Sequence, residues 1–344
     1  MKKFLVLTVA LLLSGSVLAA QGTKGADVLV SVNNSKITRA YIDNALQREA
    51  ALLPEEQRTQ ENLQNLANNI ISRRIDELVV LDAAKKAKVT VSAKEVKDAV
   101  DANKKNFKTE ADFNNALKQQ GTTRAKYESD IKDNLIRVKY ISNEVKKRTE
   151  LPADEEIETF YNYVVAKVKN KPVKADAKTD ELATSAANRL KRIYGEQVKV
   201  RQIFVKYSDN LTKEQKKEVN DKIKELKKEL SAKDVNFSQL SEKYSDDEVL
   251  RQTRGDIGYV LKEDLTPEVS KVIFGLKIGE YNKSPIKTGN GYHFFRVEEM
   301  KADMPIEYNA VKQFLADTLY RQSIQDEYGV LMDELRASAN IKFN

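Results

Sequence analysis

The sequence predicts a multidomain α+β protein, in which a helical lobe is completed by a C-terminal helix and carries one separate α+β domain. Three observations support this fold class. The chain has 344 residues, which exceeds the usual size of one small domain. Apolar residues recur at three- and four-residue steps over most of its length, which is the helical period. Between residues 196 and 300 the alternation typical of strands interrupts this period.

The N-terminus has the three parts of a secretory signal peptide. Two lysines open the chain, an apolar run follows at 4–13, and Val17 and Ala19 are small enough for cleavage after Ala19. The apolar run is shorter than the roughly 20 residues that a spanning helix needs. We therefore expect residues 1–19 to be removed on export, leaving a protein that is soluble outside the cytoplasm and has no stable membrane insertion.

Composition excludes several kinds of site. The chain has no cysteine and one histidine, His293, which excludes disulfides, thiol catalysis, a cysteine-linked lipid anchor and a histidine-cluster metal site within one chain. The net charge is +7, but both signs alternate in runs such as 213–228. We interpret that run as a solvated helix face, and we expect no nucleic-acid partner, no metal and no cofactor.

Residues 20–150 are predicted to form the helical lobe. An extended stretch at 28–32 and a turn at 33–35 come first, and helices follow. One helix is marked by a single apolar stripe, which we interpret as packed core and not as an open client groove. The stripe consists of Leu63, Leu66, Ile70, Ile71, Ile75 and Leu78. Ser92 and Glu95 have the spacing of a capping box at the start of the next helix.

Two further segments flank the α+β region. Residues 151–195 are expected to be a linker of short helices around a polar loop at 167–179. Residues 301–344 are predicted to be a helix ending in a short strand. Because Tyr308, Val311, Leu315 and Leu319 form an apolar stripe that needs a partner, we expect 301–344 to pack on the N-terminal lobe.

Residues 196–300 have the pattern of a small α+β domain. Val198, Val200, Gln202 and Phe204 alternate along a predicted strand, and further strands are predicted at 255–260 and 292–297. Helices are predicted at 211–230 and 237–244. Gly255 and Gly258 flank Asp256 and Ile257, which indicates a turn at the start of the second strand.

Seven short stretches of this region occur in a fixed order and spacing. They are residues 200–205, 237–247, 254–259, 265–268, 274–280, 284–288 and 291–293. Together they resemble the parvulin family of prolyl isomerases. The flanking regions resemble the SurA chaperones, in a helical domain that opens with VNNSKITR and in the C-terminal helix. The resemblance implies a helical chaperone lobe plus one parvulin-like domain. It also implies a periplasmic location, whereas a host with a single membrane would release the protein or retain it in the wall.

The resemblance also implies a site. The parvulin pocket is built from two histidines, an Asp or Cys, a Leu or Ile, a Met and a Phe. Matching positions hold Asp247, Ile257 and His293, and departing positions hold Gln202 for the first histidine, Leu265 for the methionine and Val269 for the phenylalanine. By the resemblance, Asp247, His293 and Gln202 are the catalytic candidates. The substrate-binding candidates are Ile257, Leu265, Val269, Phe274 and Thr288.

The departures predict a weakened isomerase. Leu265 roughly keeps the volume of a methionine. Gln202 can donate and accept hydrogen bonds but cannot titrate, and Val269 removes an aromatic face from the ring pocket. Two residues also have a structural interpretation, since His293 alternates with apolar residues on a strand and Asp247 has a sequence context typical of a helix cap.

Three functions are compatible with the sequence. The first is a parvulin-type peptidyl-prolyl isomerase that acts on unfolded or nascent exported polypeptides. The second is a holdase chaperone whose parvulin domain is weak or inactive and serves to bind peptides. The third is a structural role for the helical lobe in a surface assembly, which explains nothing about residues 196–300. A cofactor is not needed for any of them.

Overall fold

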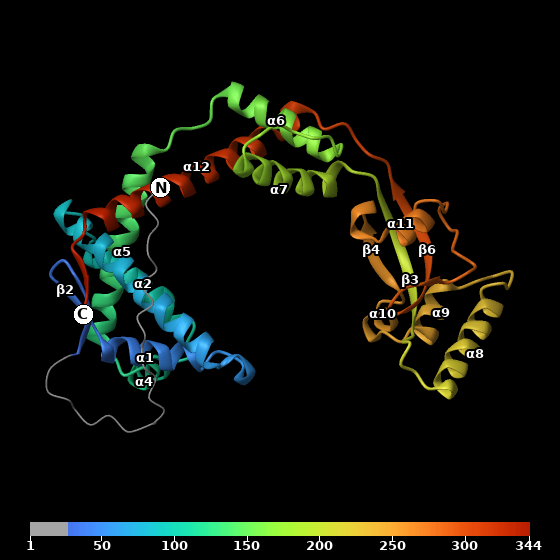
Figure 1. Cartoon of the computed structure of the whole chain (residues 1–344), viewed down its shortest axis with the longest axis horizontal. Coiled ribbons are helices and arrows are strands. Elements are labelled where there is room, and N and C mark those ends of the chain that lie inside the picture. The colour runs from blue at the N-terminus through green and yellow to red at the C-terminus, as the bar shows by residue number, and fades with distance from the viewer. Residues whose placement is uncertain (1–26) are drawn as a thin grey trace. The chain divides into compact units, whose positions relative to one another are not determined.

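The computed structural model describes residues 27–344, and the chain divides into two compact units. One unit contains the chain up to Leu151 together with Tyr320–Asn344, and the other contains Pro152–Leu319 (Figure 1). The expected signal peptide at 1–19 lies outside the described residues. The finer division into a 20–150 lobe, a 151–195 linker and a 196–300 domain stays a prediction.

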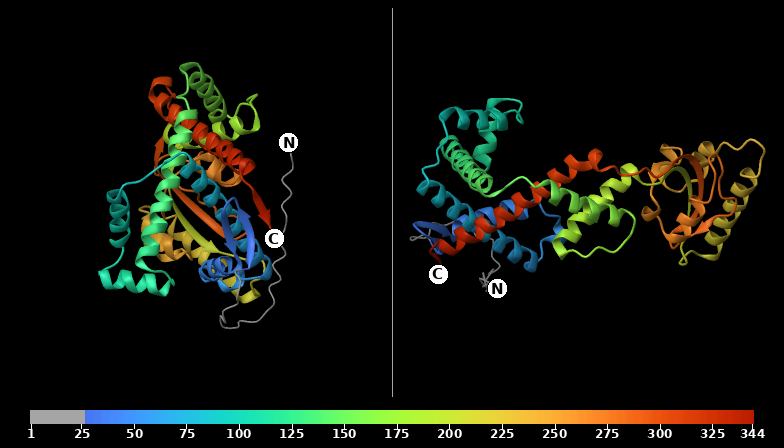
Figure 2. Two further views of the ribbon diagram at one scale, coloured as in Figure 1. Left: turned by 90° about the vertical axis from the view of Figure 1, so that its left-hand side faces the viewer. Right: turned by 90° about the horizontal axis from the view of Figure 1, so that it is seen from above.

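The first unit contains a three-stranded antiparallel sheet that joins the two ends of the chain. Strand β1 (Val28–Val32) lies between β2 (Ser35–Thr38) and β7 (Ile341–Phe343). Asn33 takes a positive φ of 50° in the tight turn between β1 and β2, which Asn tolerates better than most residues. Figure 2 shows β7 beside the first hairpin.

Five α-helices and one short 3-10 helix follow between residues 39 and 148 of the first unit. They are α1 (Arg39–Ala50), η1 (Glu55–Gln57), α2 (Gln60–Lys86), α3 (Ala93–Lys104), α4 (Glu110–Gln119) and α5 (Arg124–Arg148). A Ser or Thr side chain accepts a backbone N–H at the start of each of the five α-helices. The apolar stripe of α2 is core, because Ile70, Ile71, Ile75 and Leu78 are buried against β1 and β2.

The C-terminal part of α12 (Tyr308–Ser338) completes this core. Met332 is buried in the same cluster as the α2 stripe. The Arg336 guanidinium donates two hydrogen bonds of 2.7 Å to the Asp76 carboxylate on α2, which is the geometry of a two-point Arg–carboxylate pair. Residues 320–344 are therefore part of the N-terminal core.

The N-terminal part of α12 packs elsewhere, which differs from the sequence-based expectation. Val311 and Leu315 are buried against α6 (Asp154–Val168) and α7 (Ala177–Tyr194), with Tyr308 and Leu319 beside them. The reason is that the two helices of residues 151–195 pack against each other as a hairpin. Its own apolar face, centred on Phe160, needs the α12 stripe as a partner.

The rest of the second unit is an α+β domain built on a four-stranded antiparallel sheet. The strand order is β4 (Asp256–Val260), β3 (Gln197–Lys206), β6 (Gly291–Lys301), β5 (Ile286–Lys287). Helices α8 (Lys213–Glu229) and α9 (Phe237–Tyr244) pack on one face, and α11 (Pro267–Ile273) packs on the other. The short elements α10 (Glu248–Gln252) and η2 (Lys262–Asp264) complete the domain.

Two neighbouring ion pairs join α7 to the α+β domain within the second unit. Lys191, almost fully buried, donates to Glu263 at 2.5 Å, and Arg192 pairs with Asp264 at 3.0 Å. Both acidic partners belong to η2, directly before Leu265 and α11. The helical hairpin thus holds the segment that leads into one side of the candidate site.

Ending the chain after Leu319 tests whether the C-terminal residues belong to the N-terminal core. We expect the first unit to lose more than about 3 kcal/mol of stability, because several buried side chains and strand β7 are removed. Differential scanning calorimetry of the full and shortened chains measures the change. Ile324→Ala, which trims a side chain that is 37% exposed on the same helix, is the control. An unchanged melting temperature in the shortened chain would contradict this packing.

Candidate functional site

The pairing of β3 with β6 brings the central residues of the site together. Gln202 lies opposite Phe295, and Phe204 lies opposite His293. Directly opposed residues of an antiparallel pair point to the same side, so these four side chains share one face of the sheet. It is the face on which α11 packs.

A chain of hydrogen bonds runs through the imidazole of His293. The amide Nε2 of Gln202 lies 2.8 Å from Nδ1, and the hydroxyl of Thr288 lies 2.7 Å from Nε2. An amide nitrogen can only donate, so Nδ1 accepts and the ring proton is on Nε2. Nε2 then donates to Thr288, whose hydroxyl donates to the side chain of Asn290. All of the links are satisfied by this one tautomer.

His293 is buried between aromatic rings. It is 9% exposed, with the ring of Phe204 at 5.0 Å and that of Phe295 at 6.0 Å and nearly parallel. Burial lowers the pKa of the imidazole below its ordinary value, because the charged form loses its hydration. The imidazole is therefore neutral at pH 7, with both ring nitrogens hydrogen-bonded. The interpretation of His293 as a satisfied core histidine and its place in the site agree equally with this geometry.

Three of the substrate-binding candidates belong to one apolar cluster. Leu265, Val269 and Phe274 come from the segment before and along α11 and pack in the cluster that contains Phe295. Val269 is only 6% exposed, so its side chain is part of the domain core. Phe274 is half-buried, and the ammonium of Lys262 lies 5.0 Å from its ring centroid.

Ile257 lies at a bulge in β4. Val200 pairs with Gly258 and Arg201 pairs with Asp256, so Ile257 is the extra residue between two register pairs. Bulges change the direction of a side chain, and that of Ile257 remains 36% exposed. It is an apolar group available to a ligand near the edge of the sheet.

Asp247 is a helix cap in this structure. Its carboxylate accepts the backbone N–H of Leu250 at 2.9 Å at the start of α10. Among the described residues, no hydrogen bond or ion pair links it to Gln202 or His293. The preceding residue, Asp246, is tied to β3 by bonds to the backbones of Phe204 and Lys206. The catalytic role of Asp247 stays a prediction.

Three supporting residues were missed by the sequence analysis. The hydroxyl of Ser241 donates to the carbonyl of Gln202 at 2.8 Å, and Ser245 accepts the N–H of Phe204. Asn282 accepts the N–H of Phe295 at 2.6 Å and donates to the carbonyl of His293. The two serines had a detectable signal, since Ser241 is a polar residue on the buried side of α9 and Ser245 is the buried residue that ends this helix. Asn282 is in a loop and had none.

Gly255 supports the backbone of Gln202. The carbonyl of Gly255 accepts the N–H of Gln202 at 2.8 Å, and the backbone of Gly255 adopts a φ of +82°. A Cβ at this position would lie 2.6 Å from the carbonyl oxygen of Gln202 and 2.7 Å from the hydroxyl of Ser241. Both the conformation and the close approach therefore require glycine.

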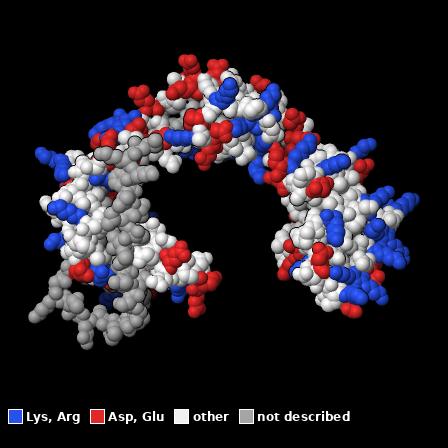
Figure 3. All heavy atoms as spheres, in the orientation of Figure 1, with Lys and Arg blue, Asp and Glu red and all other residues white. Residues whose placement is uncertain are grey.

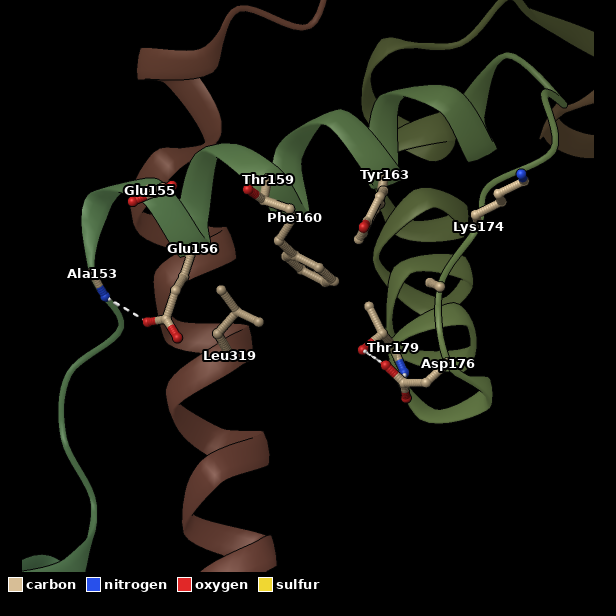
Figure 4. Close-up of a pocket in the computed structure, with 11 residues that line it drawn as sticks. Ala153, Glu155, Glu156, Thr159, Phe160, Tyr163, Lys174, Asp176, Thr179 and Leu319 are labelled. Carbon is tan, nitrogen blue, oxygen red and sulfur yellow. Dashed lines mark hydrogen bonds between the residues drawn. The ribbon is translucent and has the colours of Figure 1, made fainter.

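A cleft lies in the helical part of the second unit, beneath α6. It has a volume of about 800 Å³ and is bordered by α6, the start of α7 and Leu319 of α12 (Figure 4). Phe160, Tyr163 and Leu319 give it an apolar side, while Glu156 and Asp176 are engaged at its rim in capping the two helices. The cleft has room for one or two side chains of an extended peptide.

Residues 27–344 contain neither a cluster of metal ligands nor a membrane-spanning helix. No group of three or more His, Asp or Glu residues is placed to hold a metal ion in that range. Within the same residues, none of the helices is both long enough and apolar enough to cross a bilayer.

Known proteins match the two regions that carry the sequence resemblance. Residues 202–299 match the family described as the PPIC-type PPIase domain, and residues 1–141 match the family described as the SurA-like N-terminal domain. These matches confirm the resemblance and the predicted fold class. The foldase protein PrsA of Staphylococcus aureus is 26% identical over 251 residues, which cover 73% of this chain. The matched part spans 64% of that relative's length.

Solved structures are more distant. A crystal structure of PrsA from Bacillus anthracis is 21% identical, covers 78% of this chain and 94% of its own, and has a TM-score of 0.29. A structure described with PEB4 and Cj1289, SurA-like chaperones of Campylobacter jejuni, is 15% identical, covers 92% and 98%, and has a TM-score of 0.40.

The buried imidazole predicts a pH dependence of stability. The unfolded chain has an ordinary histidine pKa of about 6.5, and burial lowers the folded value, so the unfolded state binds more protons below about pH 6.5. Stability is thus complete above that pH and falls as the pH drops. We expect urea unfolding at about pH 5.5 to show a loss against about pH 7.5.

His293→Asn identifies the source of that loss. The chain has one histidine, and histidine is the side chain whose ordinary pKa lies in this range. The variant is expected to be less stable at both pH values, with a smaller difference between them. An equal pH dependence in the variant would mean that His293 is not the group that titrates.

Proposed function

We propose that this chain, which combines a SurA-like N-terminal domain with a PPIC-type PPIase domain, is an exported folding factor that catalyses cis–trans isomerisation of Xaa-Pro bonds in unfolded proteins. The observation that carries the proposal is the hydrogen-bond chain through His293, set beside the apolar cluster of α11. The foldase name of the Staphylococcus aureus relative supports the same function.

The proposal assigns a role to each region. Residues 1–19 direct export to the periplasm and are removed, and residues 196–300 form the isomerase. The helical remainder, 20–195 with 301–344, binds unfolded envelope or secreted proteins. The cleft beneath α6 supports this second role, because it offers an apolar side that no side chain of residues 27–344 fills.

Prolyl isomerisation requires little chemistry from the protein. The barrier of roughly 18–20 kcal/mol comes from the partial double-bond character of the peptide bond. A site lowers it by binding the twisted imide better than either planar form, so no nucleophile and no metal are needed. An apolar surface for the proline ring and fixed hydrogen-bonding groups beside it are sufficient.

The geometry suits His293 to a positioning role. Both ring nitrogens are used within the chain, Nδ1 by Gln202 and Nε2 by Thr288. The neutral imidazole therefore holds its two partners in place and does not need to transfer a proton. In this proposal Leu265, Phe274 and Ile257 supply apolar contacts, and Asp247 supplies a carboxylate at the end of β3.

A second candidate function is a holdase whose isomerase domain serves to bind peptides. The observation that favours it is the burial of Val269, which is 6% exposed and packed within the core. A side chain in that state contributes little surface to a proline ring. Gln202 also favours the holdase function, since with an amide in place of the first histidine the site cannot contain a pair of imidazoles.

Exchange spectroscopy on a panel of Xaa-Pro peptides separates these functions. We expect the purified protein to exceed the uncatalysed rate, which corresponds to tens to hundreds of seconds. Gln202→His should raise kcat/KM by about tenfold, or about 1.4 kcal/mol of transition-state stabilisation. Val269→Phe should add less, because a larger side chain in a packed cluster costs about 1–3 kcal/mol of stability. No rate above background on any peptide would favour the holdase.

Asp247 needs a control for its capping role. Asp247→Ala removes both the charge and the cap, and loss of a cap costs about 1 kcal/mol. Asp247→Asn keeps a side-chain oxygen for the N–H of Leu250 while removing the charge. We expect both variants to lose activity. If the asparagine variant keeps full activity, Asp247 acts as a cap alone.

Filling the cleft beneath α6 tests the client-binding role. Thr159 lines the cleft and is exposed, so Thr159→Trp should occupy it. We expect this variant to suppress aggregation of an unfolded client less well, with unchanged peptide isomerisation. Glu158→Trp, at the next exposed position of α6 and outside the cleft lining, is the matched control. Equal chaperone activity in both variants would exclude this cleft.

A further inference from the structure

Helix α8 sorts its charges into separate faces. In sequence the run 213–228 mixes both signs, but at 3.6 residues per turn its exposed lysines fall within an arc of about 100°. These are Lys213, Lys217, Lys224, Lys227 and Lys228, called the lysine face below. The exposed acidic residues of α8 occupy the adjacent arc, and its apolar residues occupy a third. Figure 3 shows Lys and Arg gathered over α8.

The lysine face is free of ion pairs. Other lysines of α8 are engaged, as Lys216 donates to the carbonyl of Asp209 at 2.8 Å and Lys222 pairs with Asp246 at 2.6 Å. Within residues 27–344, none of the five ammonium groups of the lysine face forms a salt bridge. All five residues are exposed. Their charge is therefore available to a partner.

The lysine face is held on a fixed support. Ile223 and Leu226 of α8 are buried against β3 and α9, together with Leu230 just after the helix. From Lys213 to Lys228 the face extends about 22 Å along the helix, at 1.5 Å per residue. It lies on the opposite side of the sheet from the hydrogen-bond chain of His293, because α8 and α11 pack on opposite faces.

The chemistry of this face favours an extended anionic surface. Lysine offers a mobile point charge and not the rigid fork with which arginine recognises a single carboxylate or phosphate. The arc contains Asn220 between its lysines and no apolar side chain that could insert into lipid. Basic residues beside a bilayer are attracted by anionic headgroups without insertion. Nucleic-acid sites on single strands would add aromatic side chains for stacking.

We propose that the lysine face of α8 binds the anionic phospholipid surface of a membrane. The contact is peripheral and electrostatic, and it leaves the opposite face of the sheet, which carries the candidate isomerase site, accessible. This inference goes beyond the proposed function and does not depend on isomerase activity. Its consequence is that an exported folding factor would be concentrated where chains emerge from the membrane.

Vesicle sedimentation tests the proposal with the full chain. The probes are vesicles of equal parts phosphatidylglycerol and phosphatidylcholine, and vesicles of phosphatidylcholine alone. We expect binding to the anionic vesicles only. Binding should weaken as salt rises, since the screening length shrinks from about 10 Å at 0.1 M to about 3 Å at 1 M.

Two variants of equal charge identify the surface. The test variant carries Lys→Gln at the five positions of the lysine face. The control carries Lys→Gln at five exposed lysines of the first unit, which form no ion pair among the described residues: Lys85, Lys105, Lys108, Lys118 and Lys132. We expect the test variant to bind at least about tenfold more weakly, and the control to bind nearly as well as the native protein. Circular dichroism checks that both variants fold.

Three results would overturn the proposal. Absence of binding to anionic vesicles at low salt would exclude a membrane partner. Equal weakening in both variants would assign the effect to net charge and not to the lysine face. Preferential binding to duplex DNA or to an acidic peptide, measured by anisotropy against the same vesicles as competitor, would assign the face to a different macromolecule. None of these results bears on whether the protein isomerises peptides.

Discussion

The pairing of β3 with β6 is the interaction on which the candidate site depends. The register is continuous from Val200 to Lys206, after one shift between Lys199 and Val200. It places Gln202 and His293, which are 91 positions apart in the chain, within hydrogen-bonding distance. Other groups then fix the two strands. Ser241 and Gly255 hold the backbone of Gln202 from one side, and Asn282 bridges the backbone of β6 from the other. A shift of one residue in this register would move the imidazole to the α8 face and break each of these contacts.

Two ion pairs also determine how the α+β domain contacts the helical hairpin of α6 and α7. Lys191 and Arg192 on α7 bind the two acidic residues of η2, and the chain then passes directly into Leu265 and α11. One wall of the candidate site is thus attached to the helical part of the same unit. The cleft beneath α6 and the hydrogen-bond chain of His293 are separate features, so variants can test the proposed peptide binding and the proposed isomerisation independently.

Much of this arrangement could be predicted from sequence, because local rules determine it. The capping box of Ser92 and Glu95 located the start of α3, alternation located β3, and the spacing of short motifs pointed to His293. What could not be predicted depends on contacts between distant residues. No feature of the local sequence indicated that the apolar stripe around Val311 would pack on residues 151–195 and not on the N-terminal lobe. The run at 213–228 mixes both charges in sequence, so it did not indicate a single lysine face. That face became apparent only when the structure defined the helix and its buried side. For Asp247, local sequence indicated the cap that the structure contains.

The central claim is that the single histidine is a neutral, hydrogen-bonded group that organises a proline-binding site. Nitrogen-15 NMR of the imidazole tests it directly, since the chain contains no other histidine to overlap with it. We expect a neutral ring at pH 7 with its proton on Nε2, a pKa below the ordinary 6.5, and shifted resonances when an Xaa-Pro peptide is added. A charged ring at pH 7, a proton on Nδ1, or resonances that no proline-containing peptide perturbs would contradict it.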